Sequence, residues 1–257
     1  MPSQYIKQAY WSCLNALRRW QSPSDVVLSP HDWITAVQAQ FTNHDKPIIM
    51  VDGGAHDGVF AKKFASQFSN IKIHAFEPNT DLLPELQTNL KNIPGSINTL
   101  GLAETTGSQS FNIGASPMTS SMLPPSDIGK TYFNDVIQTE EQRTIHTTSL
   151  DDWAAQNNIN RIDILKLDLQ GYEIPALNGA KNLLKQGIPC VFTEVSFIPF
   201  YEGSALFSDV DTLMRAHGYR LLNLYNLATR NNDHQLTGGD ALYILDQSNT
   251  RIIKRAA

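Results

Sequence analysis

Short apolar runs recur along most of the chain, and stretches with helical spacing separate them. The clearest runs are Ile48–Val51, Ile71–Phe76, Asp163–Asp168 and Cys190–Val195. Nearly continuous apolar runs of this length predict strands that are buried on both faces of a sheet. Between the first two runs, Phe60, Phe64 and Phe68 recur with helical spacing. Strands that alternate with helices predict an α/β fold, with a mostly parallel sheet and helices on both faces.

The same alternation extends over the rest of the core. Further strands are expected at 98–102, 107–114, 144–148, 219–224 and 241–245, and further helices at 79–91, 174–186 and 208–217. Ser149 is expected to cap another helix, whose first turn is acidic. Residues 115–140 are rich in Ser and Pro and break the pattern, which predicts a long loop. A loop of this length inside a compact domain is typical of a lid or a binding loop.

The first 45 residues have a pattern of their own. One helical face there carries Ile6, Tyr10, Cys13, Leu14 and Leu17. We therefore expect an N-terminal helical extension over residues 1–45 and one domain over residues 46–257. The apolar face of such a helix favours docking on the domain or a homo-oligomer interface. A helix on a membrane surface is less favoured, because basic residues are few.

Composition narrows the class of protein. The chain has 257 residues, of which 41% are hydrophobic and 18% are charged, and this is typical of a globular protein with a full core. Its net charge of −5 argues against a nucleic-acid partner. We expect no transmembrane segment, because no apolar run is long enough, and the N-terminus lacks a signal-peptide pattern. The cysteines, Cys13 and Cys190, form no motif, so a reduced, cytoplasmic setting is expected.

The turn after the first strand carries the most specific information about a ligand. It reads Asp52-Gly53-Gly54, and the next strand ends just before Glu77. In parallel sheets, ligands bind beyond the carboxyl ends of the strands, near the point where the strand order reverses. Glycines let the backbone approach a ligand closely, and an acid about 20 residues further on accepts hydrogen bonds from ribose hydroxyls. This combination predicts a ligand that contains adenosine.

The chemistry of the turn favours S-adenosylmethionine (SAM) over a dinucleotide. A pyrophosphate site would need Gly-x-Gly-x-x-Gly, whereas residues 53–58 read Gly-Gly-Ala-His-Asp-Gly. Asp52 and Asp57 would repel a pyrophosphate, but they would attract the cationic ammonium and sulfonium groups of SAM. A NAD-type oxidoreductase stays open as an alternative function, although the glycine spacing argues against it.

Four segments resemble the SAM-dependent methyltransferases of the FkbM type. They are VDGGAHDG (51–58), FEPN (76–79), TTSLDDW (147–153) and LKLDLQGYEIPALNGA (165–180). The last segment is the most specific, although Gln170 stands where the family usually has a glutamate. The resemblance implies a Rossmann-like class I methyltransferase fold, with a seven-stranded sheet whose last strand is antiparallel. It also implies methyl transfer to an oxygen of a sugar, glycan, polyketide or other small hydroxylated acceptor.

The resemblance further implies a cofactor site for SAM. The residues at its methionine end would be Asp52, Gly53 and Gly54. Glu77 would hold the ribose hydroxyls. The residues beside the adenine would be Pro78, Asn79 and Ala103 or Glu104. Asp168, at the end of the strand beside the first one, would face the point of methyl transfer.

Methyl transfer to a hydroxyl also requires that the hydroxyl proton be removed. Asp168 and Glu194 leave adjacent predicted strands at the same edge of the sheet. One of them can act as the general base, or both can hold a divalent metal ion through their oxygens. Two acids are a small ligand set, so a metal ion is possible but not expected. His56, in the cofactor turn, is a further catalytic candidate.

Several residues near these strand ends are candidates for binding the acceptor. They are Ser121, Gln170, Tyr172, Glu173 and Tyr201. An aromatic ring at this edge can stack on a sugar face, or it can serve local packing. Glu173 also lies in the first turn of a helix, where the helix dipole alone favours an acid. Because Gln170 replaces the family glutamate, a protein that binds SAM without catalysis stays open as a further alternative.

Overall fold

A computed structural model of the chain describes residues 33–41, 46–230 and 233–246. The strands are β1 (Ile48–Gly53), β2 (Ile71–Phe76), β3 (Gly95–Asn98), β4 (Gly101–Leu102), β5 (Gly107–Gly114), β6 (Thr139–Thr148), β7 (Ile164–Leu167), β8 (Cys190–Ser196), β9 (Tyr219–Thr229) and β10 (Leu236–Leu245). The α-helices are α2 (Trp33–Gln38), α3 (Val59–Ala65), α4 (Leu83–Leu90), α5 (Asp127–Phe133), α6 (Leu150–Gln156), α7 (Glu173–Asn178), α8 (Lys181–Gln186) and α9 (Phe207–Ala216). The short 3₁₀ helices are η1 (Thr80–Leu82), η2 (Pro117–Thr119) and η3 (Asn134–Ile137).

Seven strands form one sheet in the order β3-β2-β1-β7-β8-β10-β9. The pairings from β3 through β2, β1 and β7 to β8 are all parallel. β10, the last strand in sequence, is antiparallel to both of its neighbours, β8 and β9. The predicted Rossmann-like sheet of seven strands, mostly parallel with the last strand antiparallel, is therefore confirmed. The strand order reverses at β1, between β2 and β7.

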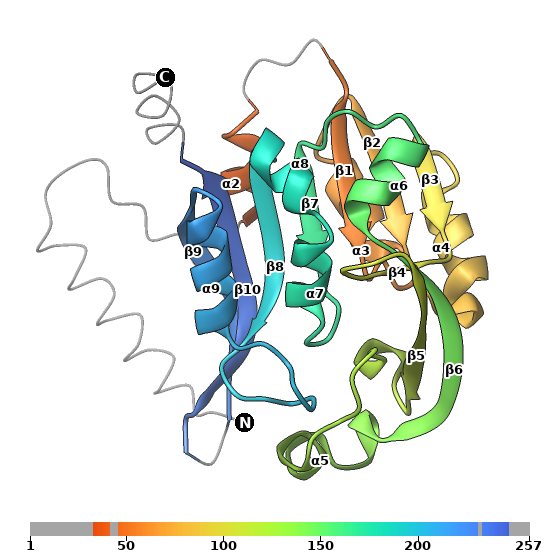
Figure 1. Cartoon of the computed structure of the whole chain (residues 1–257), viewed down its shortest axis with the longest axis vertical. Helices are drawn as coiled ribbons and strands as arrows, with labels where there is room; N and C mark the ends of the chain where they lie inside the picture. Colours follow the sequence, from red (N-terminus) through yellow and green to blue (C-terminus); the bar gives the residue numbers. More distant parts are fainter. Residues whose placement is uncertain (1–32, 42–45, 231–232, 247–257) are drawn as a thin grey trace, which may run out of the picture. The chain divides into compact units, whose positions relative to one another are not determined.

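Helices cover both faces of this sheet (Figure 1). Helices α6, α7, α8 and α9 contribute to the core on one face, together with Leu165 and Leu167 of β7. Helices α2, α3 and α4 contribute to the core on the other face, together with Met50 of β1 and Ile164 of β7. Successive residues of a strand thus enter opposite cores. Because the central strands are buried on both faces, they appear in the sequence as nearly continuous apolar runs.

A second sheet has the order β4-β6-β5, and Figure 1 shows β5 and β6 beyond the end of the main sheet toward which β1, β2 and β3 point. The prediction of one strand over residues 98–102 is wrong. β3 ends at Asn98 in the main sheet, and β4 begins at Gly101 in the second sheet. Gly101 and Leu102 pair with β6 rather than with β2. An apolar run does not show which neighbour its residues pair with, so the sequence did not show this change of sheet.

The segment 115–140 is partly helical, so the prediction of a continuous loop there is wrong. It contains η2, α5 and η3. The hydroxyl of Ser126 accepts a hydrogen bond from the Gly129 backbone N–H at 3.0 Å and donates one to the Pro199 carbonyl at 2.7 Å. Ile137 packs with Phe200 in a small separate core. These tertiary contacts, which composition does not show, stabilise the helical turns.

The helix expected over residues 174–186 is two helices, α7 and α8, separated by Gly179 and Ala180. The break lets the chain approach β4 closely, because a Cβ atom on Gly179 would lie 2.0 Å from the Ala103 carbonyl oxygen. The Asp151 carboxylate then accepts hydrogen bonds from the backbone N–H groups of Asn182 and Leu183, at 2.9 and 3.0 Å. These bonds satisfy N–H groups in the first turn of α8 that have no partner within the helix.

Helix α2 is the part of the predicted N-terminal extension that the structure describes. Trp33 stacks on Phe60, Phe64 and Phe192, with ring centroids 5.3, 5.3 and 4.2 Å apart. Helix α2 therefore packs on the face of the sheet that carries α3. The helical face predicted within residues 6–17 lies outside the described residues, and the boundary between residues 45 and 46 stays a prediction. Within the described ranges, no helix combines the length and the apolar character needed to cross a membrane.

Candidate functional site

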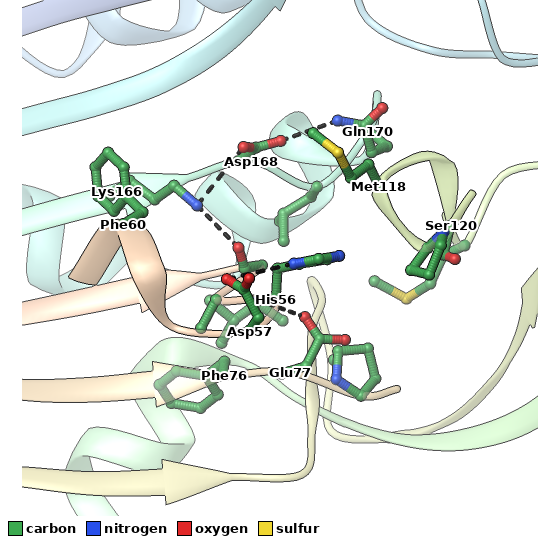
Figure 2. A pocket seen from close by; sticks show the side chains of 18 of the residues that line it. His56, Asp57, Phe60, Phe76, Glu77, Met118, Ser120, Lys166, Asp168 and Gln170 are labelled. Carbon is green, nitrogen blue, oxygen red and sulfur yellow. Dashed lines mark hydrogen bonds and ion pairs between the residues drawn. The ribbon is translucent and has the colours of Figure 1, made fainter. Parts of the chain in front are cut away.

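A cavity of about 440 Å³ lies at the carboxyl ends of β1, β2 and β7. Its wall combines the turn after β1, the end of β2, the end of β7 and part of the 115–140 segment. Figure 2 shows Met118 and Ser120 of that segment together with Glu77 and Asp168 around the cavity. This is the edge of an α/β sheet at which ligands bind, beside the point where the strand order reverses.

Gly54 is at the centre of the turn after β1, with φ at +71°. A Cβ atom at this position would lie 1.9 Å from the backbone oxygen of Asp168. The backbone N–H groups of Gly54 and Ala55 both donate to the Phe76 carbonyl, at 3.0 Å each. Only glycine fits here, for two reasons. The backbone is in the left-handed region, and the Asp168 backbone at the end of β7 leaves no room for a Cβ atom. The turn therefore joins the ends of three strands.

Glu77 is 6% exposed and directly follows β2. Its Oε2 accepts a hydrogen bond from the His56 backbone N–H at 2.9 Å, and its Oε1 accepts one from the Asn79 backbone N–H at 2.8 Å. Burial raises the pKa of the Glu77 carboxyl, and these two N–H groups oppose the rise. A carboxylate has about four acceptor positions, so each oxygen keeps a lone pair for a further donor.

Lys166 lies in the middle of β7 and is 5% exposed. Its Nζ is 3.1 Å from Asp52 Oδ1, and it donates to the carbonyls of Gly54 at 2.9 Å and Gly53 at 3.3 Å. Burial lowers the pKa of Lys166, but the carboxylates of Asp52 and Asp168 more than offset this, so its pKa is raised. This residue was not predicted from the sequence. The available signal was a single lysine within a buried apolar run, since a lysine is almost never buried without a partner.

Asp168, directly after β7, lines the cavity, and 43% of its side chain is exposed. The side-chain amide of Gln170 donates to Asp168 Oδ1 at 3.0 Å and to Glu194 Oε2 at 3.1 Å. Asp168 Oδ2 lies 3.7 Å from Lys166 Nζ. Figure 2 shows Asp168 between Lys166 and Gln170. The predicted neighbours Asp168 and Glu194 are thus brought together, and Gln170 joins them.

Two acids at this edge, Glu194 and Glu173, have raised pKa values. Burial raises the pKa of Glu194 well above its ordinary value, and the charges of Asp168, Glu173 and Asp240 raise it further. Burial also raises the pKa of Glu173 to about 7, although the Leu169 backbone N–H donates to its Oε1 at 2.8 Å. Glu194 therefore holds a proton more readily than an ordinary glutamate, and this limits the repulsion between adjacent carboxylates.

Gln170 has φ at +53° and is fixed by two other predicted residues. The Tyr201 hydroxyl donates to Gln170 Oε1 at 3.1 Å, and the Ser121 hydroxyl donates to the Gln170 carbonyl at 2.8 Å. Both residues are buried, so in this arrangement they support Gln170 from behind the cavity wall. Tyr172 points elsewhere, because its hydroxyl donates to Gln109 at 2.7 Å.

The predicted site residues fall into two groups. Those that line the cavity are Gly54, His56, Glu77, Pro78, Asp168 and Gln170. Those outside its lining are Asp52, Gly53, Asn79, Ala103, Glu104, Ser121, Tyr172, Glu173, Glu194 and Tyr201. Ala103 follows β4 and is buried, and the three residues before it, 100–102, line the cavity instead.

His56 has φ at +51° and lines the cavity between Glu77 and Asp168 (Figure 2). Its Nδ1 is 3.5 Å from Asp57 Oδ1. Its Nε2 is buried and makes no hydrogen bond within the described part of the chain. His56 thus holds the Glu77 carboxylate through its backbone N–H, whereas its buried Nε2 has no hydrogen-bond partner among the described residues.

Two polar residues of the closing hairpin, Asn226 and Asp240, also line the cavity. The Asn226 side-chain amide donates to Asp240 Oδ2 at 2.6 Å. Burial raises the pKa of Asp240 to about 6, and the Asn226 hydrogen bond opposes this rise. The sequence analysis did not identify either residue, because nothing in the local pattern shows that β10 lies beside β8.

The metal hypothesis gains no further ligands from the structure. Among the residues that the structure describes, no group of three or more His, Cys, Asp or Glu side chains is arranged to hold a metal ion. Asp168 and Glu194 stay the candidates, and the Gln170 amide donates to both of them.

A curated protein shares part of its sequence with this chain. The hexuronic acid methyltransferase AglP of Haloferax volcanii is 30% identical over 125 residues, which is 48% of this chain and 46% of the relative. The aligned region thus spans about half the length of each protein.

Solved methyltransferase structures are also similar. The methyltransferase FkbM from Methylobacillus flagellatus is 18% identical, with a TM-score of 0.48 over 77% of this chain and 43% of that one. The precorrin-6y C5,15-methyltransferase from Geobacter metallireducens is 9% identical, with a TM-score of 0.45 over 87% of this chain and 93% of that one. The model of the methyltransferase FkbM domain matches residues 52–221, which include the glycine turn, Glu77 and the Asp168 segment. The chain belongs to the FkbM methyltransferase family.

Proposed function

We propose that this protein is a SAM-dependent O-methyltransferase whose acceptor is a hydroxyl of a sugar or a similar polyhydroxylated molecule. One observation carries the proposal. A single cavity has Glu77 at the end of β2 and Asp168 at the end of β7, and the Gly54 turn lies between these two strand ends. Glu77 suits ribose hydroxyls, and Asp168 suits a hydroxyl that must lose its proton. Membership of the FkbM family supports methyl transfer as the reaction.

The residues present fit SAM. Both oxygens of Glu77 are fixed by backbone N–H groups and keep lone pairs for the two ribose hydroxyls. Leu100 and Leu102 give the cavity an apolar wall that suits the adenine ring. Asp57, at the turn, offers a carboxylate to the ammonium group. When bound, SAM supplies an activated methyl group, whose bond to sulfur breaks as the acceptor oxygen bonds to carbon.

Asp168 is the group that we assign as general base. It faces the cavity, so it can take the hydroxyl proton as the acceptor oxygen attacks. The Gln170 amide fixes one of its oxygens, and the Lys166 ammonium lies 3.7 Å from the other. Glu194, whose pKa burial raises, serves as the neighbour that holds a proton. This division gives the two acids of the original hypothesis different roles.

The acceptor class rests on the relative and on the cavity. AglP is described as a hexuronic acid methyltransferase, and this supports a sugar acceptor. Met118 and Phe60 offer apolar surface to the faces of a sugar ring, and Gln170 offers polar atoms to its hydroxyls. We assign Ser121 and Tyr201 to the support of Gln170 rather than to direct contact with the acceptor.

The direct test is methyl transfer from SAM carrying a labelled methyl group to a panel of methyl glycosides. We expect S-adenosylhomocysteine and one methylated product in equal amounts. Tight SAM binding with no product from any hydroxyl acceptor would instead favour a protein that binds SAM without catalysis. Binding of NAD in place of SAM, measured by calorimetry, would favour the oxidoreductase alternative.

Several finer expectations stay predictions. They are the cytoplasmic setting, the absence of a nucleic-acid partner and a homo-oligomer formed through the N-terminal helix. The residues of that helix lie outside the described ranges. Sedimentation of the full chain before and after deletion of residues 1–32 would test the oligomer.

A further inference from the structure

Three acids lie side by side across the acceptor end of the main sheet. Lys166 and Leu167 of β7 pair with Phe192 and Thr193 of β8, so Asp168 comes next to Glu194. Glu194 in turn pairs directly with Asp240 of β10. We call Asp168, Glu194 and Asp240 the acid row. Adjacent strands are about 4.8 Å apart, so the three carboxyl groups influence one another, which is one reason why the pKa of Glu194 is raised.

The close hydrogen-bond partners of the acid row are uncharged. The Gln170 amide donates to Asp168 at 3.0 Å and to Glu194 at 3.1 Å, and the Asn226 amide donates to Asp240 at 2.6 Å. These amides fix the positions of the carboxyl groups. Because Glu194 is assigned as the neighbour that holds a proton, the negative charge of the row belongs to Asp168 and Asp240, and the uncharged amides do not cancel it. Gln170, Asn226, Asp168 and Asp240 line the cavity, so an acceptor there meets the negative side of the row.

The cation nearest the acid row, Lys166, is already paired with another acid. Lys166 is the only lysine or arginine among the described residues that line the cavity. Its Nζ pairs with Asp52 at 3.1 Å and donates to the Gly54 carbonyl at 2.9 Å, whereas Asp168 is further away at 3.7 Å. The charges of Lys166 and Asp52 therefore largely balance. The described wall thus offers no lysine or arginine that is free to pair with a carboxylate on the acceptor.

We propose that the acid row makes this enzyme select sugar acceptors that carry no carboxylate, with Asp240 as a specificity-determining residue. The inference rests on the proposed sugar O-methylation and names its substrate class. A uronate bound here would place its carboxylate near the acid row without a counter-ion, and like charges at this range repel. A neutral sugar instead donates its hydroxyls to Asp240 and accepts hydrogen bonds from the Asn226 and Gln170 amides. This preference is opposite to the one that the name of AglP describes.

The test uses methyl glycosides of glucose, galactose and mannose, each in three forms: the neutral hexoside, the uronate and the uronamide. The uronate and the uronamide have nearly the same shape and differ in charge. Transfer of a labelled methyl group from SAM gives kcat/KM for each form. We expect the hexoside and the uronamide to be methylated at least tenfold more efficiently than the uronate.

Two variants locate the source of the selectivity. Asp240→Asn keeps an acceptor oxygen for Asn226 and removes one charge, so the ratio of uronamide to uronate should fall at least threefold. Glu85→Gln removes a charge from the exposed side of α4, outside the cavity lining, and the ratio should change less than twofold.

The outcomes separate the two proposals. A uronate methylated as well as its uronamide, or better, would overturn the inference and leave sugar methylation standing. An unchanged ratio in Asp240→Asn, with a folded variant, would overturn the role of Asp240. SAM binding without methylation of any sugar in the panel would overturn the proposed function and this inference with it.

Discussion

The two ends of the cavity are built in different ways. At the cofactor end, backbone contacts dominate: the Gly54 turn is in contact with the end of β7, and Glu77 binds two backbone N–H groups. At the acceptor end, side chains from three strands meet, and Gln170 joins two carboxyl groups through one amide. The cofactor end is thus fixed by chain geometry, and the acceptor end by electrostatics and hydrogen bonds. Substitutions at the cofactor end should therefore lower stability and SAM binding, whereas substitutions at the acceptor end should lower turnover.

The largest effect is expected from Gly54→Ala at the cofactor end. The new methyl group would lie 1.9 Å from the Asp168 backbone oxygen, and the residue has φ at +71°. We expect a loss of more than about 4 kcal/mol in the free energy of unfolding and the loss of SAM binding. Urea denaturation and calorimetry measure both quantities.

The matched control is Gly203→Ala, which has φ at +73° and no heavy atom within 4 Å of the added Cβ. It should cost only the strain of a left-handed alanine, about 1–2 kcal/mol. Equal losses in the two variants would show that the contact with β7 contributes nothing.

At the acceptor end, Asp168→Asn should separate binding from chemistry. The amide keeps the shape of the side chain but cannot take the hydroxyl proton, so turnover should fall about 10²- to 10⁴-fold. The Kd of SAM should stay unchanged, because Glu77 and the Gly54 turn are untouched. Glu194→Gln should cost less turnover, since Glu194 does not line the cavity. A larger loss in Glu194→Gln than in Asp168→Asn would reverse the two roles.

Glu173 gives the acceptor end a pH-dependent stability. Its pKa is raised from 4.5 to about 7 in the folded protein, so ionisation favours unfolding. Below about pH 4.5 the Glu173 carboxyl is protonated in both the folded and the unfolded protein, so the free energy of unfolding keeps its full value. As the pH rises from there through 7, the free energy of unfolding should fall by up to about 3 kcal/mol. Glu173→Gln keeps the oxygen that accepts the Leu169 N–H and does not ionise. Its advantage in urea denaturation should grow from about 1 kcal/mol at pH 5 to about 3 kcal/mol at pH 8.

The exposed Glu104 provides the comparison for this experiment, because it pairs with Lys181 at the surface. Glu104→Gln should show no such growth between the two pH values. An advantage of Glu173→Gln that is the same at both pH values would contradict the raised pKa.

The smallest effect concerns the link between the acceptor end and the 115–140 segment. The Tyr201 hydroxyl lies within hydrogen-bond distance of Gln170 Oε1 and the Thr119 carbonyl, and it shares its one proton between these two acceptors. Tyr201→Phe should cost about 1 kcal/mol of stability and lower turnover several-fold, with the Kd of SAM unchanged. Tyr172→Phe also removes a hydroxyl, but that hydroxyl binds Gln109, so turnover should not change. Equal turnover in both variants would contradict the supporting role of Tyr201.

The two ends also differ in how far the sequence predicted them. Gly54 and Glu77 were predicted from local patterns, because a glycine turn and a strand exit are visible within a few residues, and Pro78 followed from the resemblance to the family. All three line the cavity. Asp168 and Gln170 followed from the segment that resembles the family. The sheet itself was predicted because central strands buried on both faces give nearly continuous apolar runs.

The residues that the sequence analysis missed depend on contacts between distant segments. The burial of Lys166 depends on its ion pair with Asp52, which lies on another strand. The position of Asp240 beside Glu194 depends on the register of β10 against β8, two strands that pair without a shift from Gly238 to Ile244. A shift of one residue would place Asp240 on the opposite face. The sequence does not show which strand β10 pairs with or in which register, so it did not predict this part of the acceptor end.

Glu77 is proposed to hold the ribose of SAM in this cavity. This role is tested most directly by calorimetric titration of S-adenosylhomocysteine and its 2′-deoxyribose analogue into the wild-type protein and Glu77→Ala. Hydrogen bonds to a charged group contribute about 1.5–3 kcal/mol each, so the wild type should bind the 2′-hydroxyl form at least about tenfold more tightly. A folded Glu77→Ala variant should bind both ligands weakly and with equal affinity. The same preference for the 2′-hydroxyl in the variant, or no preference in the wild type, would contradict the account.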